Sequence, residues 1–531
     1  MVLAVILTLL PIVVIFLLMT KFRAAADTSG VIGWILTLAI ALLFFKTSIV
    51  TGFLASLAGV IQSFPVSLMV LTSLLQITFM EATGAIQRIA VFVKTFAASD
   101  QAVQIMLINV GAGTLLVAVG ATPVSILPPI LIALGYSTFI AVLLPAIGFD
   151  ALCTFALLGA PLVAYSDLTG VTLVQAAQVF ARFLPVISTV IGFGMLWVVG
   201  RWSLIRKGWI PCLIAGVTNG CIALLMAYTP VLNQGVVLTG VVAGAGTMLI
   251  MLLYLKILGK PIIDRSNLTE ADLAVEQKMP LGVALSPWLI LIPILFIVAY
   301  WPWLHNILYV QWAMPVSILP GQKPILTRML WNAYTWVLIS TILACIFLKP
   351  SGKAIGETLT KWLRRAPRPV LSAAVFFAIA LVMNNSGPYF VNVIQAAKGI
   401  VPNMIGVLAL GSAHVFGRIY PFISAYLGLF GGFVSGSEAS TIAMFAKYHI
   451  LTSKMLYAGY SPSRLQNAAL IVTAATAIGS GLASVISPAK LQNAAATIDA
   501  LGIESQVIKT AVLISIVMTL VAAVLALILI L

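Results

Sequence analysis

Apolar runs of about twenty residues, separated by short polar connectors, recur along this 531-residue chain and limit what it can fold into. A helix of that length crosses the hydrocarbon layer of a bilayer, where every backbone polar group needs a partner within the protein. Hydrophobic residues make up 62% of the chain and charged residues only 8%, which is outside the range of soluble globular domains. The sequence therefore predicts an all-α membrane protein with about 12 to 14 membrane-spanning helices.

The basic residues are distributed as in membrane proteins. The formal net charge of +15 is compatible with a nucleic-acid partner, but Lys and Arg fall mainly in connectors, as at 201–207, 256–265 and 364–368. Cytoplasmic loops of membrane proteins carry such an excess of basic residues. We therefore expect contact with a lipid bilayer and no nucleic-acid partner.

One segment, residues 256–286, is long and polar enough to be a linker, and it holds four of the 13 acidic residues. Thr269 and Asp272 have the spacing of a capping box at the start of a short surface helix. The segment divides the chain into residues 1–255 and 287–531. We expect these to be two transmembrane repeats joined by a cytoplasmic linker.

Three sequence landmarks recur in the same order in the two halves, which indicates a duplicated fold. Each is a helix end or a break containing Gly or Pro inside apolar sequence. The pairs are FMEATG (79–84) with VMNNSG (382–387), VAVGATPVSI (117–126) with FVSGSEASTI (433–442), and LLGAPL (157–162) with SVISPA (484–489). Internal repeats with broken helices are typical of secondary transporters, whose substrate sites lie near the bilayer midplane. The two halves are therefore predicted to be related, inverted repeats with re-entrant hairpins or broken helices.

The break VSGSEAS has the composition of an anion site. Gly436 permits an unusual backbone angle, and serines supply donors beside the amides of a half-helix start, which attract carboxylates. Alternatively, the serines are small packing residues and Glu438 caps a helix at the membrane surface. The residues expected to line a substrate cavity are Gly120, Thr122, Ser125, Ser435, Gly436, Ser437, Ser440 and Thr441.

Three acidic residues are candidates for proton coupling. An ionised Glu438 would repel an anionic substrate, whereas a protonatable Glu438 can take up a proton as the substrate binds. Asp150, in AIGFDALCTF, is embedded in apolar sequence and is the alternative. Glu81 is ambiguous because Arg88 and Lys94 follow it, so an interfacial salt bridge is an equally good reading.

Two cations could pair with a substrate carboxylate. Lys490 follows the break at ISP and Arg418 lies in HVFGRIYPF, where each could instead extend toward a membrane surface. The sequence contains neither an HExxH motif nor a P-loop, and its three histidines are scattered. A pairing of Ser437 with His449 as an intramembrane protease has little support. We expect neither an enzyme nor a bound cofactor or metal.

With these breaks placed, the chain resembles the lactate permease family of bacterial and archaeal carriers. The segment PFISAYLGLFGGFVSGSEASTIAMF (421–445) is similar to the family's Pro-Phe…Gly-Ser-Asp-Thr-Ser-Ser-Asn segment. LVMNNSG (381–387) and VISP (485–488) are similar to its Val-Met-Asn-Ser-Ser-Gly and Met-Ile-Ser-Pro. The first-half segments TGAIQRI (83–89) and GATPVSI (120–126) occur in the order in which the family has similar segments. The resemblance adds Asn384, Asn385 and Ser487 to the expected substrate-binding residues.

The resemblance implies a proton-coupled symporter for lactate or a related 2-hydroxy monocarboxylate such as glycolate. It also implies a multi-pass protein of a bacterial or archaeal cell membrane, with a moving transport domain, a scaffold domain and a possible homodimer. The alternatives are a Na⁺-coupled carrier for a different carboxylate, with backbone carbonyls as ion ligands, and a passive anion channel.

The chain departs from the family at positions that bear on substrate and proton. Glu438 stands where the family has Asp, and Ile442 replaces a family Asn. Asp150 appears where the family has Thr, and Leu115 takes the place of a first-half Glu. The carboxyl group at the main break is thus kept, whereas one polar side chain beside it is lost.

Overall fold

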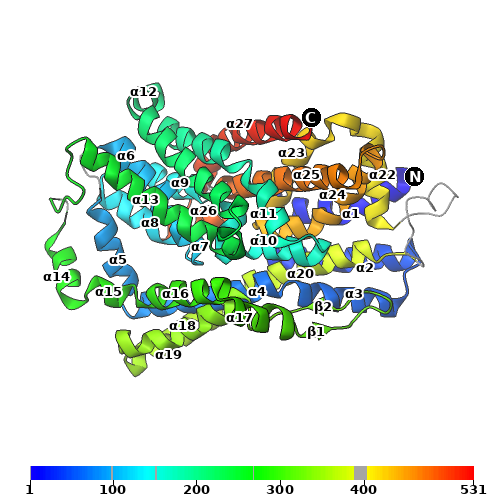
Figure 1. The fold of residues 1–531 in the computed structure, drawn as a ribbon, viewed down its shortest axis with the longest axis horizontal. Helices are drawn as coiled ribbons and strands as arrows, with labels where there is room; N and C mark the ends of the chain where they lie inside the picture. Colours follow the sequence, from blue (N-terminus) through cyan, green and yellow to red (C-terminus); the bar gives the residue numbers. More distant parts are fainter. Residues whose placement is uncertain (1, 97–99, 150–151, 267, 388–402) are drawn as a thin grey trace.

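The computed structural model describes residues 2–96, 100–149, 152–266, 268–387 and 403–531. Most of these residues are helical (Figure 1). The two short strands β1 (Pro315–Val316) and β2 (Ile325–Leu326) form an antiparallel pair in which Pro315 lies opposite Leu326. The all-α class predicted from the sequence is confirmed.

The helices before the polar linker include several short pieces that follow one another closely. They are α1 (Val2–Thr20), α2 (Ala26–Leu43), α3 (Ile49–Gln62), α4 (Phe64–Ala82), α5 (Ala85–Lys94), α6 (Gln101–Ile105), η1 (Met106–Ala112), α7 (Gly113–Ala118), α8 (Pro123–Ala133), α9 (Thr138–Gly148), η2 (Cys153–Phe155), α10 (Ala156–Thr169), α11 (Leu173–Ala181), α12 (Leu184–Tyr228), η3 (Leu232–Leu238) and α13 (Thr239–Ile257).

The linker and the second half are built in the same way. Their helices are α14 (Glu270–Lys278), α15 (Leu281–Ala284), α16 (Ser286–Tyr300), α17 (Pro302–His305), η4 (Asn306–Gln311), α18 (Ala333–Leu348), α19 (Gly352–Arg365), α20 (Pro367–Asn384), α22 (Met404–Phe416), η5 (Gly417–Ile419), α23 (Tyr420–Ser435), α24 (Glu438–Leu456), α25 (Pro462–Leu482), η6 (Ala483–Ile486), α26 (Pro488–Ala496) and α27 (Glu504–Ile530).

Within the described residues, ten helices are long and apolar enough to cross a membrane, or eleven if the bent pair α16 with α17 and η4 counts as one span. This count takes the 45-residue α12 as one helix and is fewer than the 12 to 14 expected from hydropathy. The difference arises because several apolar runs form shorter helices of 10–17 residues, namely α3, α8, α9 and α18. Hydropathy counts an apolar run as a span even where the chain is interrupted.

The long helix α12 is in fact a hairpin of two antiparallel segments. Its backbone leaves the helical region at Arg201 (φ 51°, ψ −147°). A Cβ on Gly220 would lie 2.2 Å from the backbone nitrogen of Pro185, so the two ends of α12 are in direct contact. One of the ten long helices therefore passes through the bundle twice.

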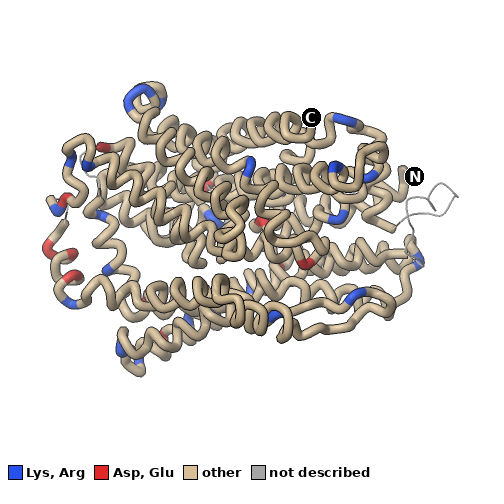
Figure 2. Tube along the Cα trace, viewed as in Figure 1, with Lys and Arg blue, Asp and Glu red and all other residues tan. Residues whose placement is uncertain are grey.

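The helices form a bundle with α25 at its centre. In Figure 1, α23 and α27 lie above α25, whereas α2, α3 and α20 lie below it, and α16, α18 and α19 form the lower edge. Every residue from Ala468 to Ser487 is buried. Figure 2 shows that Lys, Arg, Asp and Glu gather at the two ends of the long axis and in loops, with few among the central helices. This is the charge distribution of a protein surrounded by lipid.

The linker docks on the first half through ion pairs. The side chain of Thr269 accepts from the Asp272 amide and that of Asp272 accepts from the Thr269 amide, which confirms the predicted capping box at the start of α14. Lys94 Nζ lies 2.8 Å from Asp272 Oδ1, and Arg88 Nη2 lies 3.0 Å from Glu276 Oε1. The basic residues that follow Glu81 therefore pair with the linker.

Helices α23 and α25 pack so closely that glycine is required at their contact. A Cβ on Gly428 would lie 2.0 Å from the carbonyl oxygen of Thr476, and a Cβ on Gly479 would lie 1.9 Å from that of Ala425. Small residues allow membrane helices to approach at backbone distance. This contact holds the second-half break in place, because α23 ends there.

We expect Gly428→Ala to destabilise the protein by about 1–3 kcal/mol, the usual cost of overpacking a close contact. Thermal unfolding in detergent measures the effect. Gly459→Ala is the matched control, since a Cβ there meets nothing within 4 Å. Equal melting temperatures for the two variants would contradict the close packing of α23 on α25.

Candidate functional site

Four interruptions of the described helices lie at the second and third landmark pairs of the sequence. Gly120 (φ +88°) separates α7 from α8, and Gly436 (φ +68°) separates α23 from α24. Helix α9 ends at Gly148, the next described element is η2 (Cys153–Phe155), and the α10 backbone is left-handed at Leu157, Leu158 and Gly159. Ser487 separates η6 from α26. The predicted broken helices are therefore present in both halves.

Two contacts join the first-half break at 149–155 to the second half. The Thr154 hydroxyl donates a hydrogen bond of 2.7 Å to the Glu438 carboxylate. The Lys490 ammonium lies 3.8 Å from the centroid of the Phe149 ring. Two of the five charged residues that the sequence singled out thus face the segment between α9 and α10.

The two second-half breaks also face each other. A Cβ on Gly436 would lie 4.0 Å from the hydroxyl oxygen of Ser487, so little more than van der Waals contact separates them. Lys490 Nζ donates to the hydroxyl of Ser484 in η6. Lys490 is therefore held at the start of α26 by a hydroxyl and an aromatic ring, with no described carboxylate within ion-pair distance.

The serines and threonine of the main break form one hydrogen-bonded cluster. Ser435 Oγ and Thr441 Oγ1 are 3.1 Å apart, and Ser480 of α25 donates to Thr441 over 2.8 Å. Ser437 caps α24 by accepting from the amide of Ser440. Ser480 belongs to the cluster but was not predicted, because it lies in a run of small apolar residues that carries no polar signal.

Glu438 is the acidic residue of this cluster and is 5% exposed. It occupies the first turn of α24, where the positive end of the helix dipole favours a negative charge by about 0.3–1 kcal/mol. The hydrogen bond from Thr154 links this buried carboxylate to the first half of the chain.

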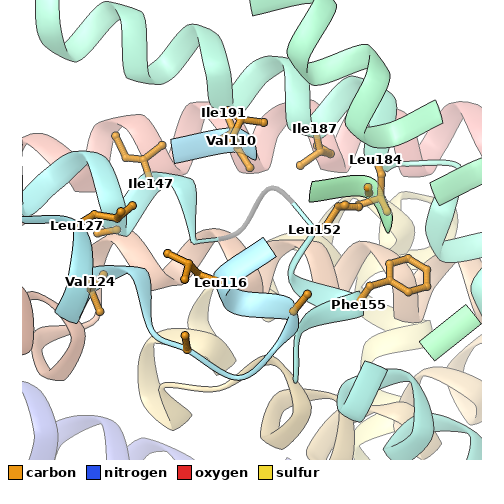
Figure 3. Packing of buried hydrophobic residues seen from close by; sticks show 14 of the residues in the cluster. Val110, Leu116, Val124, Leu127, Ile147, Leu152, Phe155, Leu184, Ile187 and Ile191 are labelled. Atoms are coloured by element: carbon orange, nitrogen blue, oxygen red, sulfur yellow. The ribbon is translucent and has the colours of Figure 1, made fainter. Parts of the chain in front are cut away.

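The break at Gly120 lies against α4. A Cβ on Gly120 would lie 2.8 Å from Ser73 Cβ, and Thr122 Oγ1 donates to Ser125 Oγ over 3.1 Å. Figure 3 shows Leu116 and Val124, which flank this break, in the apolar cluster that also holds Leu152 and Phe155. Helix α7, which ends at this break, packs on α10, but no described hydrogen bond joins Thr122 or Ser125 to the serine cluster.

Other predicted residues lie away from the serine cluster. Glu81 forms an ion pair of 2.8 Å with Arg365 of α19, so it does have a salt bridge, although not with the basic residues that follow it. Arg418 is exposed at the turn between α22 and α23. Asp150 lies outside the described residues.

The two asparagines at the end of α20 have partners in loops. Asn385 accepts from Gln322, and the carbonyl oxygen of Asn384 accepts from Asn403. Neither is hydrogen-bonded to a residue of the breaks in the described part of the chain. Their partners place them at one end of the bundle.

A mainly apolar recess lies next to the start of α10, between α4, η3, α16 and α18. It is lined by Leu157, Leu158, Val237, Trp331 and Asn332 among others, and none of the predicted substrate residues contributes to it. A carboxylate needs hydrogen-bond donors or a cation, which this lining scarcely supplies. We therefore place the candidate site at the breaks.

Long apolar helices around broken helices that hold a buried carboxylate and a lysine are features of a multi-pass membrane protein. A sequence model of the L-lactate permease family matches residues 4–531. The chain belongs to this family.

Relatives with established names agree with this assignment. An L-lactate permease of Streptococcus iniae is 24% identical, with 85% of this chain and 91% of the relative covered. The glycolate permease GlcA of Escherichia coli K12 is also 24% identical, over 95% of this chain and 91% of the relative. The L-lactate permease of the same organism is 22% identical, over 96% and 93%. The relatives are permeases, not enzymes, and the chain is a transporter in the plasma membrane.

Proposed function

We propose that the protein is a proton-coupled symporter of a small 2-hydroxy monocarboxylate such as L-lactate or glycolate. The observation that carries the proposal is the hydrogen bond between Thr154 and the buried Glu438, which places a protonatable group where the broken helices of both halves meet. The names of the relatives support the class of substrate.

In the proposed cycle, a proton neutralises Glu438 before or as the substrate binds. The substrate carboxylate then pairs with the Lys490 ammonium and the N-terminal amides of α24, which attract anions. The hydroxyls of Ser435, Ser437 and Thr441 are available to the 2-hydroxyl group. Release of the substrate leaves Glu438 free to lose its proton on the other side of the membrane.

We also propose that residues 1–255 and 287–531 are related repeats joined by the 256–286 linker. The matching interruptions at Gly120 and Gly436 support this division. Homodimer formation is a further expectation from the family resemblance, and the mass of the purified protein in detergent checks it.

Uptake of labelled lactate, glycolate, pyruvate and acetate into proteoliposomes tests the function. We expect the two 2-hydroxy acids to accumulate when the outside is acidified, with Na⁺ replaced by choline throughout. Uptake that requires Na⁺ would overturn proton coupling in favour of a sodium-coupled carrier. Equilibration without accumulation under any ion gradient would indicate a passive channel.

A further inference from the structure

Helix α19 lies at the lower edge of the bundle in Figure 1 and is not part of a membrane span. It has 14 residues, four of them basic, and leads into the apolar helix α20 at Pro367. Together α19 and α20 have 33 residues, whereas a span needs about 20 mainly apolar ones. Because α20 supplies the apolar part, α19 is left at the edge of the bilayer, where basic side chains are tolerated.

One side of α19 packs on α4. Trp362 Nε1 donates a hydrogen bond of 2.9 Å to the carbonyl oxygen of Leu71, and Thr358 on the same side is buried. At the end of α19, Arg365 pairs with Glu81 over 2.8 Å. Glu81 lies just before α5, the helix whose basic residues pair with the linker. Helix α19 therefore lies at the end of the bundle where the linker docks.

A second side of α19 is an exposed apolar stripe. Ile355, Leu359 and Leu363 are 44%, 45% and 63% exposed. They are four residues apart, so they follow one another along one face of the helix. Exposing three large aliphatic side chains to water is unfavourable, whereas lipid acyl chains accommodate them. The stripe is therefore a lipid-facing surface.

A third side of α19 is basic. Lys353, Lys361 and Arg364 are exposed, and their spacing places them on one face together with Glu357, which leaves two net positive charges. None of these four side chains forms an ion pair with another described residue. The basic residues of α5 differ in this respect, since the linker neutralises them. The charges of α19 are thus available to an external anion.

We propose that α19 binds anionic phospholipids in the leaflet at the linker's end of the bundle. The stripe of Ile355, Leu359 and Leu363 contacts acyl chains, and the basic face contacts phosphate groups. Amphipathic helices with a basic polar face bind anionic bilayers in this way. Free phosphate would satisfy the charges but not the stripe, whereas a phospholipid satisfies both. This surface is separate from the breaks and does not depend on the substrate or on the ion that drives transport.

Photo-cross-linking in nanodiscs tests the lipid contact in the full chain. Leu363→p-benzoylphenylalanine places a photoreactive group on the stripe, and the discs contain equal amounts of phosphatidylglycerol and phosphatidylcholine with the same acyl chains. The mass of each adduct identifies its head group. We expect phosphatidylglycerol adducts to exceed phosphatidylcholine adducts about 5-fold or more at low salt. The ratio should fall toward one in about 0.5 M NaCl, because salt screens the charges.

Removal of the basic face should abolish the preference. In the variant Lys353→Gln, Lys361→Gln, Arg364→Gln, the ratio of the two adducts at position 363 should fall toward one. The control Arg206→Gln, Lys207→Gln removes exposed charges from the turn of α12 and should leave that ratio unchanged.

A second control moves the photoreactive group. Leu225 is 58% exposed on α12, and no basic residue follows Lys207 in that helix. Leu225→p-benzoylphenylalanine should therefore give a ratio near one. The salt dependence at position 363 needs no substitution of a basic residue, so it remains a test if the triple variant does not fold.

A ratio near one at Leu363 in low salt would overturn the proposal, as would a ratio that the triple variant leaves unchanged. Cross-links from Leu363 to a second copy of the chain instead of lipid would show that protein covers the stripe, which also overturns it. Inorganic phosphate should lower the ratio no more than NaCl of equal ionic strength. A larger decrease with phosphate would show that the basic face selects the free anion and would contradict lipid binding.

Discussion

Glu438→Gln is expected to abolish accumulation of substrate against a gradient while exchange continues. Glutamine has nearly the shape of protonated glutamic acid, and its amide can still accept the hydrogen bond from Thr154. The variant therefore stays in the substrate-binding state but cannot release a proton, so pH-driven uptake should end when inside and outside concentrations are equal. Proteoliposomes measured under an imposed pH gradient, and then with equal lactate on both sides, separate the two modes.

Glu81→Gln is the control for this experiment. Glu81 is a carboxylate that the sequence also nominated, but it pairs with Arg365 and is 28% exposed at its side chain. We expect its replacement to leave uphill uptake nearly unchanged. Unaltered uphill uptake in Glu438→Gln would remove Glu438 from the coupling mechanism.

Lys490→Met is expected to raise the KM for lactate by about 10-fold to 100-fold, because a hydrogen bond to a charged group contributes about 1.5–3 kcal/mol. Methionine keeps an unbranched side chain of similar length but lacks the ammonium that lies over the Phe149 ring. Initial rates over a range of lactate concentrations measure the effect. At saturating lactate, the ratio of the inside to the outside lactate concentration should change little, because Glu438 is intact.

Two further variants serve as controls for this prediction. Lys490→Arg retains the positive charge and should lose less affinity than Lys490→Met. Arg418→Gln removes the other candidate cation, which is exposed between α22 and α23, and should leave KM unchanged. A large KM increase in Arg418→Gln with none in Lys490→Met would reverse the assignment of the carboxylate-binding cation.

Local sequence chemistry predicted the positions of the helix breaks. A glycine at 436 with serines on both sides favours a break in a membrane helix, and the chain does leave the helix there. The capping box at Thr269 and Asp272 depends on a spacing of three residues and was equally readable. Span counting was less accurate, because hydropathy cannot distinguish a half-helix such as α9 from a complete span.

Partners across the bundle could not be read from the sequence. Thr154 has nothing in its surroundings that indicates Glu438, which lies 284 positions later in the chain. In the sequence, Ser480 and Thr476 are small residues of an apolar helix. Their side-chain partners on α24 are apparent only from the packing of α25 against α24. Ile442, where the family has Asn, is fully buried in the apolar core.

The sequence by itself determined the membrane class, the positions of the helix breaks and the residue types that fill them, because hydropathy, glycine geometry and capping act within a few residues. Only the tertiary structure decided which of the candidate acids and cations contact the first half of the chain. The contact of Glu438 with the first-half break, and that of Lys490 with Phe149, depend on how distant helices pack. Helix packing is fixed by shape over the whole bundle, including the glycines that bring α23 onto α25, and no local pattern encodes it.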